Sequence, residues 1–189
     1  MPTIPCPRPA LLATLLTALA LAGCAPAPTA DGTADGAAAE PARTFSFTLD
    51  ATVPGTPAEV FDLATGDISG WWDHTMSGSP ASLVIEPRPG GSFLERFDGS
   101  GDGVRHAVVT YARRGEMLRY EGPLGLAGHA VSLVTTWRFA AEGDARTTVT
   151  VEVHAAGEID PSWPEVVERT FRHFLVERFV PYCEQRAAR

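Results

Sequence analysis

A glutamate and several histidines in the middle of the chain are the side chains best suited to transfer protons. Glu95 alternates with Phe93 and Phe97, so all three share one face of a predicted strand. If that face points inward, a carboxyl group among phenylalanine rings has a raised pKa and can act as a general acid or base. The alternatives are a reversed register and a structural ion pair with a neighbouring arginine, and we favour these over catalysis.

Three histidines have neighbours that suggest a role in proton transfer. His106 shares a predicted strand face with Val104 and Val108, and so points into the core if that face does. His129 lies in a glycine-rich loop, and His74 follows two tryptophans. A single histidine is more often a surface residue or a hydrogen-bonded core residue than a catalyst. We therefore assign no catalytic residue and retain His106 and the glutamate as candidates.

The composition excludes several kinds of chemistry. The sequence has no defensible Ser-His-Asp spacing, and no cluster of cysteines and histidines has the spacing of a zinc site, so we expect no metal and no cofactor. All 15 basic residues are arginines, which excludes a Schiff-base lysine and the lysine of a P-loop. The formal net charge of −8 disfavours nucleic acid as a partner, because phosphate neutralisation needs a basic face.

The N-terminal segment has the features of an export signal. Arg8 precedes an uncharged apolar run, residues 10–22, which has the composition of a signal-peptide core and is too short to span a bilayer. The sequence Leu21–Cys24 resembles the lipobox of bacterial lipoproteins. The resemblance implies cleavage before Cys24 and acylation of its sulfur. The alternative is an ordinary secretory signal with an incidental cysteine.

These features divide the chain into three parts. We expect a lipoprotein signal peptide over residues 1–23, a disordered tether over residues 24–42 and one folded domain over residues 43–187. Ala25 follows the lipidated cysteine, and the resemblance to lipoproteins then favours sorting to the outer membrane. The expectation is an exported protein, held in the cell envelope on the periplasmic side by lipid on Cys24.

The candidate residues of the domain lie on short predicted strands. Alternating apolar and polar residues, interrupted by proline- and glycine-rich turns, predict an antiparallel meander. One helix is expected to begin at Thr56, which forms a capping box with Glu59, and a second short helix is expected to carry Trp71 and Trp72. The predicted strands cover residues 44–50, 82–86, 92–97, 104–112, 116–121, 130–139 and 146–154.

The last predicted element is a long amphipathic helix. Aromatic and apolar residues, Phe171 and Phe174 among them, recur at three- and four-residue steps from Trp163 to Tyr182. Pro181 is expected to kink or end this helix. A single long helix must bury its apolar face, and the concave side of the sheet is the large partner that the chain offers.

The order of elements and two motifs resemble the SRPBCC superfamily, which includes START lipid-transfer domains and birch-pollen-allergen-like proteins. Residues 57–61 and 70–72 look like its PxEVW…WW opening. Residues 86–93 look like the RPGG turn and strand of the branch named for the activator of heat-shock ATPase homologue. The resemblance implies an α+β helix-grip fold: a curved antiparallel sheet wrapped around a long C-terminal helix, with two short helices after the first strand.

The superfamily also implies a pocket between helix and sheet for a small apolar or amphipathic molecule. One arginine on a meander strand could clamp a carboxylate headgroup, although cross-strand pairing is the alternative. The residues that we expect to line the pocket are Phe93, Phe97, Trp71, Trp72, Phe171, Phe174 and Arg119.

The sequence is compatible with three functions. The leading prediction is a monomeric, non-enzymatic binder or carrier that contacts the membrane through the lipid on Cys24. The second is a cyclase- or hydratase-like enzyme that uses Glu95 or His106 in the same pocket. The third is a co-chaperone, which we favour least, because an exported lipoprotein does not meet a cytosolic ATP-driven chaperone.

Overall fold

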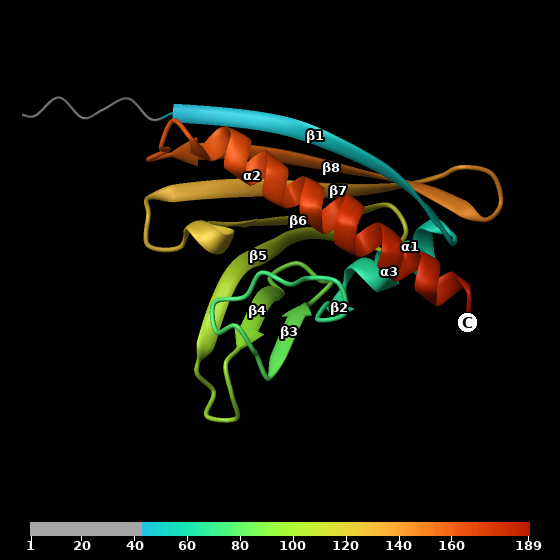
Figure 1. The fold of residues 1–189 in the computed structure, drawn as a ribbon, viewed down its shortest axis with the longest axis horizontal. Coiled ribbons are helices and arrows are strands. Elements are labelled where there is room, and N and C mark those ends of the chain that lie inside the picture. The colour runs from blue at the N-terminus through green and yellow to red at the C-terminus, as the bar shows by residue number, and fades with distance from the viewer. Residues whose placement is uncertain (1–42) are drawn as a thin grey trace, which may run out of the picture. The chain divides into compact units, whose positions relative to one another are not determined.

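The computed structural model describes residues 43–189, which form one curved antiparallel sheet and a long C-terminal helix (Figure 1). The sheet has eight strands in the order β1-β8-β7-β6-β5-β4-β3-β2, so the first and last strands of the chain pair with each other. The strands are β1 (Arg43–Pro54), β2 (Gly66–Asp67), β3 (Ser82–Ile85), β4 (Ser92–Arg96), β5 (Gly103–Arg113), β6 (Met117–Gly122), β7 (Val131–Ala141) and β8 (Arg146–Gly157).

The long helix crosses one face of this sheet (Figure 1) and has three consecutive segments. They are α2 (Trp163–Arg172), the π-helix η2 (His173–Phe179) and α3 (Val180–Ala187). The side chains that this helix buries against the sheet include Val167, Phe171, Phe174, Phe179 and Cys183. The predicted α+β helix-grip architecture is therefore confirmed.

The first helix, α1 (Pro57–Ala64), begins where the capping box predicts. The Thr56 hydroxyl accepts a hydrogen bond from the Glu59 N–H at 3.4 Å, and Glu59 Oε2 accepts one from the Thr56 N–H at 2.8 Å. These two bonds satisfy amide donors that the first turn of a helix leaves unpaired. The helix then buries its apolar side, Val60, Phe61 and Ala64, against the sheet core.

The second short helix predicted around Trp71 and Trp72 is wrong: the chain makes a single turn there. Asp67 pairs with β3 as part of β2, and its carboxylate accepts the Ser69 N–H at 3.0 Å. This local bond closes a turn in competition with a helix, and Gly70 weakens helix formation further. The turn still buries both tryptophans, as the sequence requires of such large apolar side chains.

Pro181 does not end the helix, which continues to Ala187. The preceding segment η2 is widened, and the Val180 N–H donates to the carbonyl of Leu175, five residues back. A proline ring ordinarily clashes with the carbonyl one turn earlier and donates no hydrogen bond. A π-helical turn immediately before Pro181 relaxes that conflict, so the helix passes through the proline.

No helix within residues 43–189 is long and apolar enough to cross a bilayer. The predicted signal peptide, the tether and the lipidation site at Cys24 lie outside the described residues.

Candidate functional site

A cavity of about 590 Å³ lies beneath α2 and the start of η2. The sheet contributes Leu133 and His106 to its lining, and the rest comes from the long helix, the loop after the two tryptophans and the short 3-10 helix η1 (Leu124–Leu126). The cavity is open to the surface, and its lining residues Met76 and Val166 are 56% and 42% exposed. Its apolar lining includes Trp72, Met76, Leu124, Leu126, Leu133, Val166, Val167, Phe171 and Phe174.

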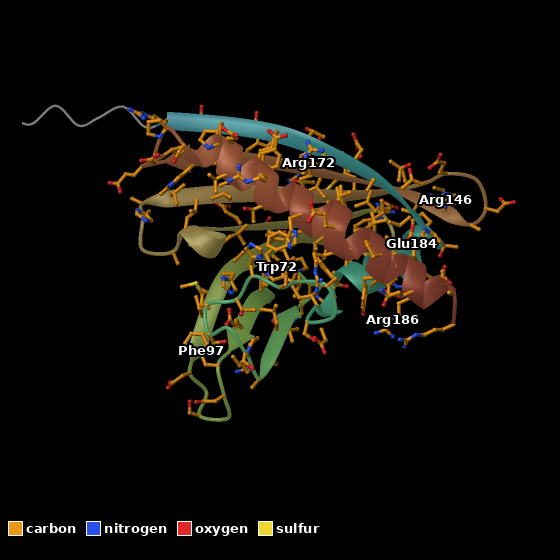
Figure 2. All side chains as sticks on the ribbon, in the orientation of Figure 1. Trp72, Phe97, Arg146, Arg172, Glu184 and Arg186 are labelled. Atoms are coloured by element: carbon orange, nitrogen blue, oxygen red, sulfur yellow. The ribbon has the colours of Figure 1, made fainter. Side chains whose placement is uncertain are left out.

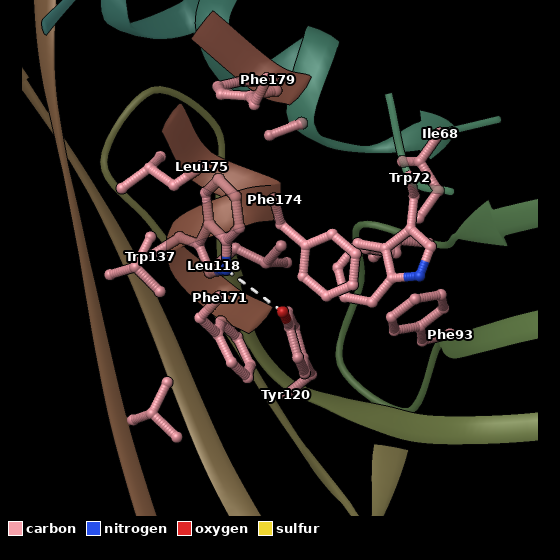
Figure 3. Packing of buried hydrophobic residues seen from close by; sticks show 14 of the residues in the cluster. Ile68, Trp72, Phe93, Leu118, Tyr120, Trp137, Phe171, Phe174, Leu175 and Phe179 are labelled. Carbon is pink, nitrogen blue, oxygen red and sulfur yellow. Dashed lines mark hydrogen bonds between the residues drawn. The ribbon is translucent and has the colours of Figure 1, made fainter. Parts of the chain in front are cut away.

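Three of the seven predicted pocket residues line this cavity: Trp72, Phe171 and Phe174. The Trp72 ring stacks on Phe174 with centroids 3.8 Å apart (Figure 3). Phe93 is fully buried and supports the other side of Trp72, edge to face at 4.9 Å. Trp71 points away from the cavity into a packed cluster with Trp137 and Phe179.

Phe97 and Arg119 do not line the cavity. Strand β4 ends at Arg96, so the alternation that carries Phe93 inward stops before Phe97, which is 37% exposed and lies far from the long helix in Figure 2. Arg119 lies between the inward residues of β6 and therefore points to the convex face. There its Nε donates to the Thr136 hydroxyl at 2.9 Å, so cross-strand pairing replaces the predicted carboxylate clamp.

Glu95 and His106 form a buried pair at the cavity wall. Glu95 has no exposed surface, His106 is 5% exposed, and Glu95 Oε2 lies 3.0 Å from His106 Nε2. The other contacts of Glu95 come from a loop: the Met76 N–H donates to Oε2 at 2.9 Å, and the Ser77 N–H and hydroxyl donate to Oε1 at 2.8 and 2.7 Å. The glutamate thus fixes the loop that forms one side of the cavity.

These contacts reverse the pKa shift that the sequence suggests for Glu95. Burial raises the pKa of the carboxyl group, but the hydrogen bonds from Met76, Ser77 and His106 outweigh burial and lower it to about 2. Glu95 is therefore an ionised acceptor at neutral pH. Since a carboxylate cannot donate, His106 donates from Nε2, and a neutral His106 ring keeps its lone pair on Nδ1.

A β-bulge aims His106 at the cavity. Phe93 pairs with Ala107 and Leu94 pairs with Arg105, so His106 is an extra residue in β5. The bulge turns His106 and its neighbour Ala107 inward together, which strict alternation does not allow. The predicted common face with Val108 is for that reason wrong.

A polar cluster borders the cavity on the helix side. Asp73 accepts hydrogen bonds from two histidines: Oδ1 lies 2.8 Å from His74 Nδ1, and Oδ2 lies 2.9 Å from His173 Nε2. Arg178 Nε lies 3.2 Å from Asp73 Oδ2. Burial raises the pKa of Asp73, but the bonds from His173 and His74 outweigh burial and hold it below its ordinary value. The cluster ties the long helix to the loop after the tryptophans.

Sequence reasoning missed the residues that come from loops. Leu124 and Leu126 line the cavity from a stretch interpreted only as a glycine-rich loop, and Met76 lies in a segment without any regular pattern. The signal that could have found them is the leucine pair within the glycine-rich segment, since large apolar residues in a loop need a burial partner. His129 packs against Trp163 instead of lining the cavity.

Comparison with known proteins gives one family and a group of similar folds. The sequence matches the family described as "Polyketide cyclase / dehydrase and lipid transport" over residues 44–184. No curated protein matches the sequence significantly.

Among solved structures, a Staphylococcus aureus protein of unknown function, SA2116, superposes with a TM-score of 0.61 at 10% identity, covering 79% of this chain and 99% of its own. A Rhizobium leguminosarum protein superposes with a TM-score of 0.53 at 16% identity, covering 76% and 97% of the two chains. DynU16, a protein in the dynemicin biosynthetic locus, gives 0.51 at 20% identity, covering 74% and 47%. At these identities the similarity concerns the fold.

Proposed function

The chain belongs to the polyketide cyclase/dehydrase and lipid transport family, and from that premise we propose that it binds a small apolar or amphipathic molecule in the cavity beneath α2. The observation that carries the proposal is the cavity itself. Its volume of about 590 Å³ falls in the range of small-molecule sites, and its lining combines many apolar side chains with a few polar ones. Such a lining lets apolar burial supply the affinity while polar groups set the orientation.

The arrangement of the lining suggests how a ligand lies. Phe171, Phe174 and Leu133 offer an apolar surface to the body of the molecule. Asp73 and His74 offer polar atoms at the rim formed by the loop after the tryptophans. An amphipathic molecule with one polar end therefore fits better than a fully apolar one.

Two valines on the long helix provide a matched test. Val166 lines the cavity and Val176 does not, yet they are 42% and 43% exposed. Titration with the fluorescent amphipathic probe 8-anilinonaphthalene-1-sulfonate is expected to give at least tenfold weaker binding to Val166→Trp, equivalent to about 1.4 kcal/mol. Val176→Trp is expected to bind like the wild type. Equal effects of the two substitutions, or no probe binding by the wild type, would overturn the proposal.

We further propose that the domain acts at the cell envelope, held by lipid on Cys24. The support is the lipobox-like sequence Leu21–Cys24 behind an uncharged apolar run. Expression of the full chain in a bacterium that processes lipoproteins is expected to place it in the membrane fraction with an acylated Cys24. Cys24→Ser is expected to release it, and a membrane-bound Cys24→Ser variant would count against lipidation as the anchor.

A second function, catalysis of the cyclase type, is favoured by one observation: His106 lines the cavity, and the buried carboxylate of Glu95 fixes its ring. With Nε2 donating to Glu95, Nδ1 is the atom that could take a proton from a ligand. A poly-β-ketoacyl thioester mimic is the probe suited to this family. His106→Phe is expected to lower its turnover about 100-fold or more. Turnover unchanged in His106→Phe would exclude this role.

A further inference from the structure

Beside the cavity, three side chains of metal-ligating types converge. Asp73, His74 and His173 each offer one ligand atom, and these atoms all lie within 4.8 Å of one another. Sequence spacing gave no sign of this group, because Asp73 and His173 are 100 positions apart. We propose that the three side chains form a binding site for a divalent transition-metal ion, with zinc as the ion that suits them.

The π-helix builds the helix side of the site. A π-turn takes in more residues than an α-turn, and here His173 and Arg178, five residues apart, both contact Asp73. Single π-helical turns inside α-helices frequently occur at functional sites, because they re-aim side chains at some loss of helix stability. In this protein the widened turn presents the His173 ring to the loop that carries Asp73.

Glu177 orients the His173 ring as a metal ligand requires. Glu177 Oε2 lies 2.8 Å from His173 Nδ1, while Nε2 of the same ring faces Asp73. Histidines that bind metals typically donate their other ring nitrogen to a carboxylate, which fixes the ring and makes it a better ligand. Glu177 thus fixes the ring with Nε2 directed at Asp73, and a bound zinc ion takes the place of the proton that Nε2 donates to Asp73.

The ligand types select the ion. Two imidazole nitrogens and one carboxylate oxygen suit zinc and its neighbours, whereas calcium and magnesium prefer oxygen ligands alone. Ligands of a tetrahedral zinc ion lie about 3.4 Å apart, given bonds of about 2.1 Å. The His74 side chain is 56% exposed and has room for the small shift that this geometry needs. Arg178, at 3.2 Å from Asp73, opposes a second cation and limits the affinity.

The position of the proposed metal site suggests a function for the bound ion. Asp73 and His74 line the cavity, so an ion held by them and by His173 lies at the rim of the cavity. If the cavity holds an amphipathic molecule, as proposed above, the ion can coordinate its carboxylate or enolate oxygen. This use rests on the proposed function, but the binding of zinc alone does not.

Zinc binding to the full chain can be measured by equilibrium dialysis with elemental analysis, and cobalt substitution reports the ligand geometry by its visible spectrum. We expect one equivalent bound, with His74→Ala and His173→Ala each weakening binding at least about tenfold. The control is His154→Ala, which removes an exposed imidazole remote from the site and is expected to change nothing.

A conservative variant distinguishes a loss of zinc affinity from a loss of the fold. Glu177→Gln keeps the fold contact but removes the oriented carboxylate, and it is expected to weaken zinc binding about tenfold. No zinc bound by the wild type, or equal binding by the wild type, His173→Ala and Glu177→Gln, would overturn the site. Zinc binding with no binding of 8-anilinonaphthalene-1-sulfonate would support the site while contradicting the proposed function.

Discussion

The long helix covers two halves of one sheet surface, and only one half is filled. In the filled half, Trp71, Trp137 and Phe179 contact one another, with ring centroids 5.0–5.7 Å apart. In the hollow half, Phe171 and Phe174 face Leu133 and the leucines of η1 across a cavity of about 590 Å³. The helix supplies aromatic rings to both halves, so the difference arises from the opposite layer. Trp71 and Trp137 fill the space in one half, whereas the smaller Leu124, Leu126 and Leu133 leave a cavity in the other.

Truncating one ring in each half tests this comparison with the largest expected effect. Phe179→Ala removes a ring with no exposed surface and is expected to lower the free energy of unfolding by about 4 kcal/mol. Phe171→Ala enlarges a cavity that is already present and is expected to lower the free energy of unfolding by only about 3 kcal/mol. Denaturant titration measures both values. Equal losses would mean that the two halves are packed alike.

Lowering the pH is expected to open the hollow half before the filled half. The pKa of Glu95 is about 2 in the folded protein and 4.5 ordinarily, so its ionisation stabilises the fold above pH 4.5. This contribution, on the order of 3 kcal/mol, is lost as pH falls from 4.5 to 2. Hydrogen exchange at decreasing pH is expected to show early opening at Met76 and Ser77, whose N–H groups donate to Glu95, and Glu95→Gln should remove that pH dependence. Simultaneous opening around Phe179 would contradict the account.

Enlarging a leucine in each half is expected to change the free energy of unfolding less than the two changes above. Leu118→Phe adds volume to the filled half, next to Trp137, and is expected to lower the free energy of unfolding by about 2 kcal/mol. Leu133→Phe places the same added volume in the cavity and is expected to be clearly less destabilising. Thermal unfolding of the two variants under the same conditions measures both changes in stability. If Leu133→Phe is as destabilising as Leu118→Phe, the hollow half has no spare volume.

The regular helices and strands were the easier part to predict from sequence. The capping box at Thr56 and the strand alternation follow local rules, and those rules hold wherever the backbone is regular. The buried strands therefore appear close to the predicted bounds, and the aromatic face of the long helix meets the sheet as expected. The branch of the superfamily and the lipidation of Cys24 stay predictions.

The candidate site was harder, because irregular backbone builds most of it. A β-bulge decides the direction of His106, a π-helix decides the direction of His173, and the end of β4 leaves Phe97 outside. Each of these departs from the two- or four-residue periodicity that sequence reasoning uses. The pairing of Asp73 with His173 is long-range, so local spacing could not reveal it.

Ligand binding requires that the hollow half admits a molecule. A crystal structure of the full chain with 8-anilinonaphthalene-1-sulfonate tests this most directly, because it locates the probe. We expect the aromatic rings of the probe to lie among Phe171, Phe174 and Leu133, with the sulfonate toward the rim at His74. Phe171 and Phe174 repacked against Leu133, with the probe on the outer surface or absent, would contradict the account.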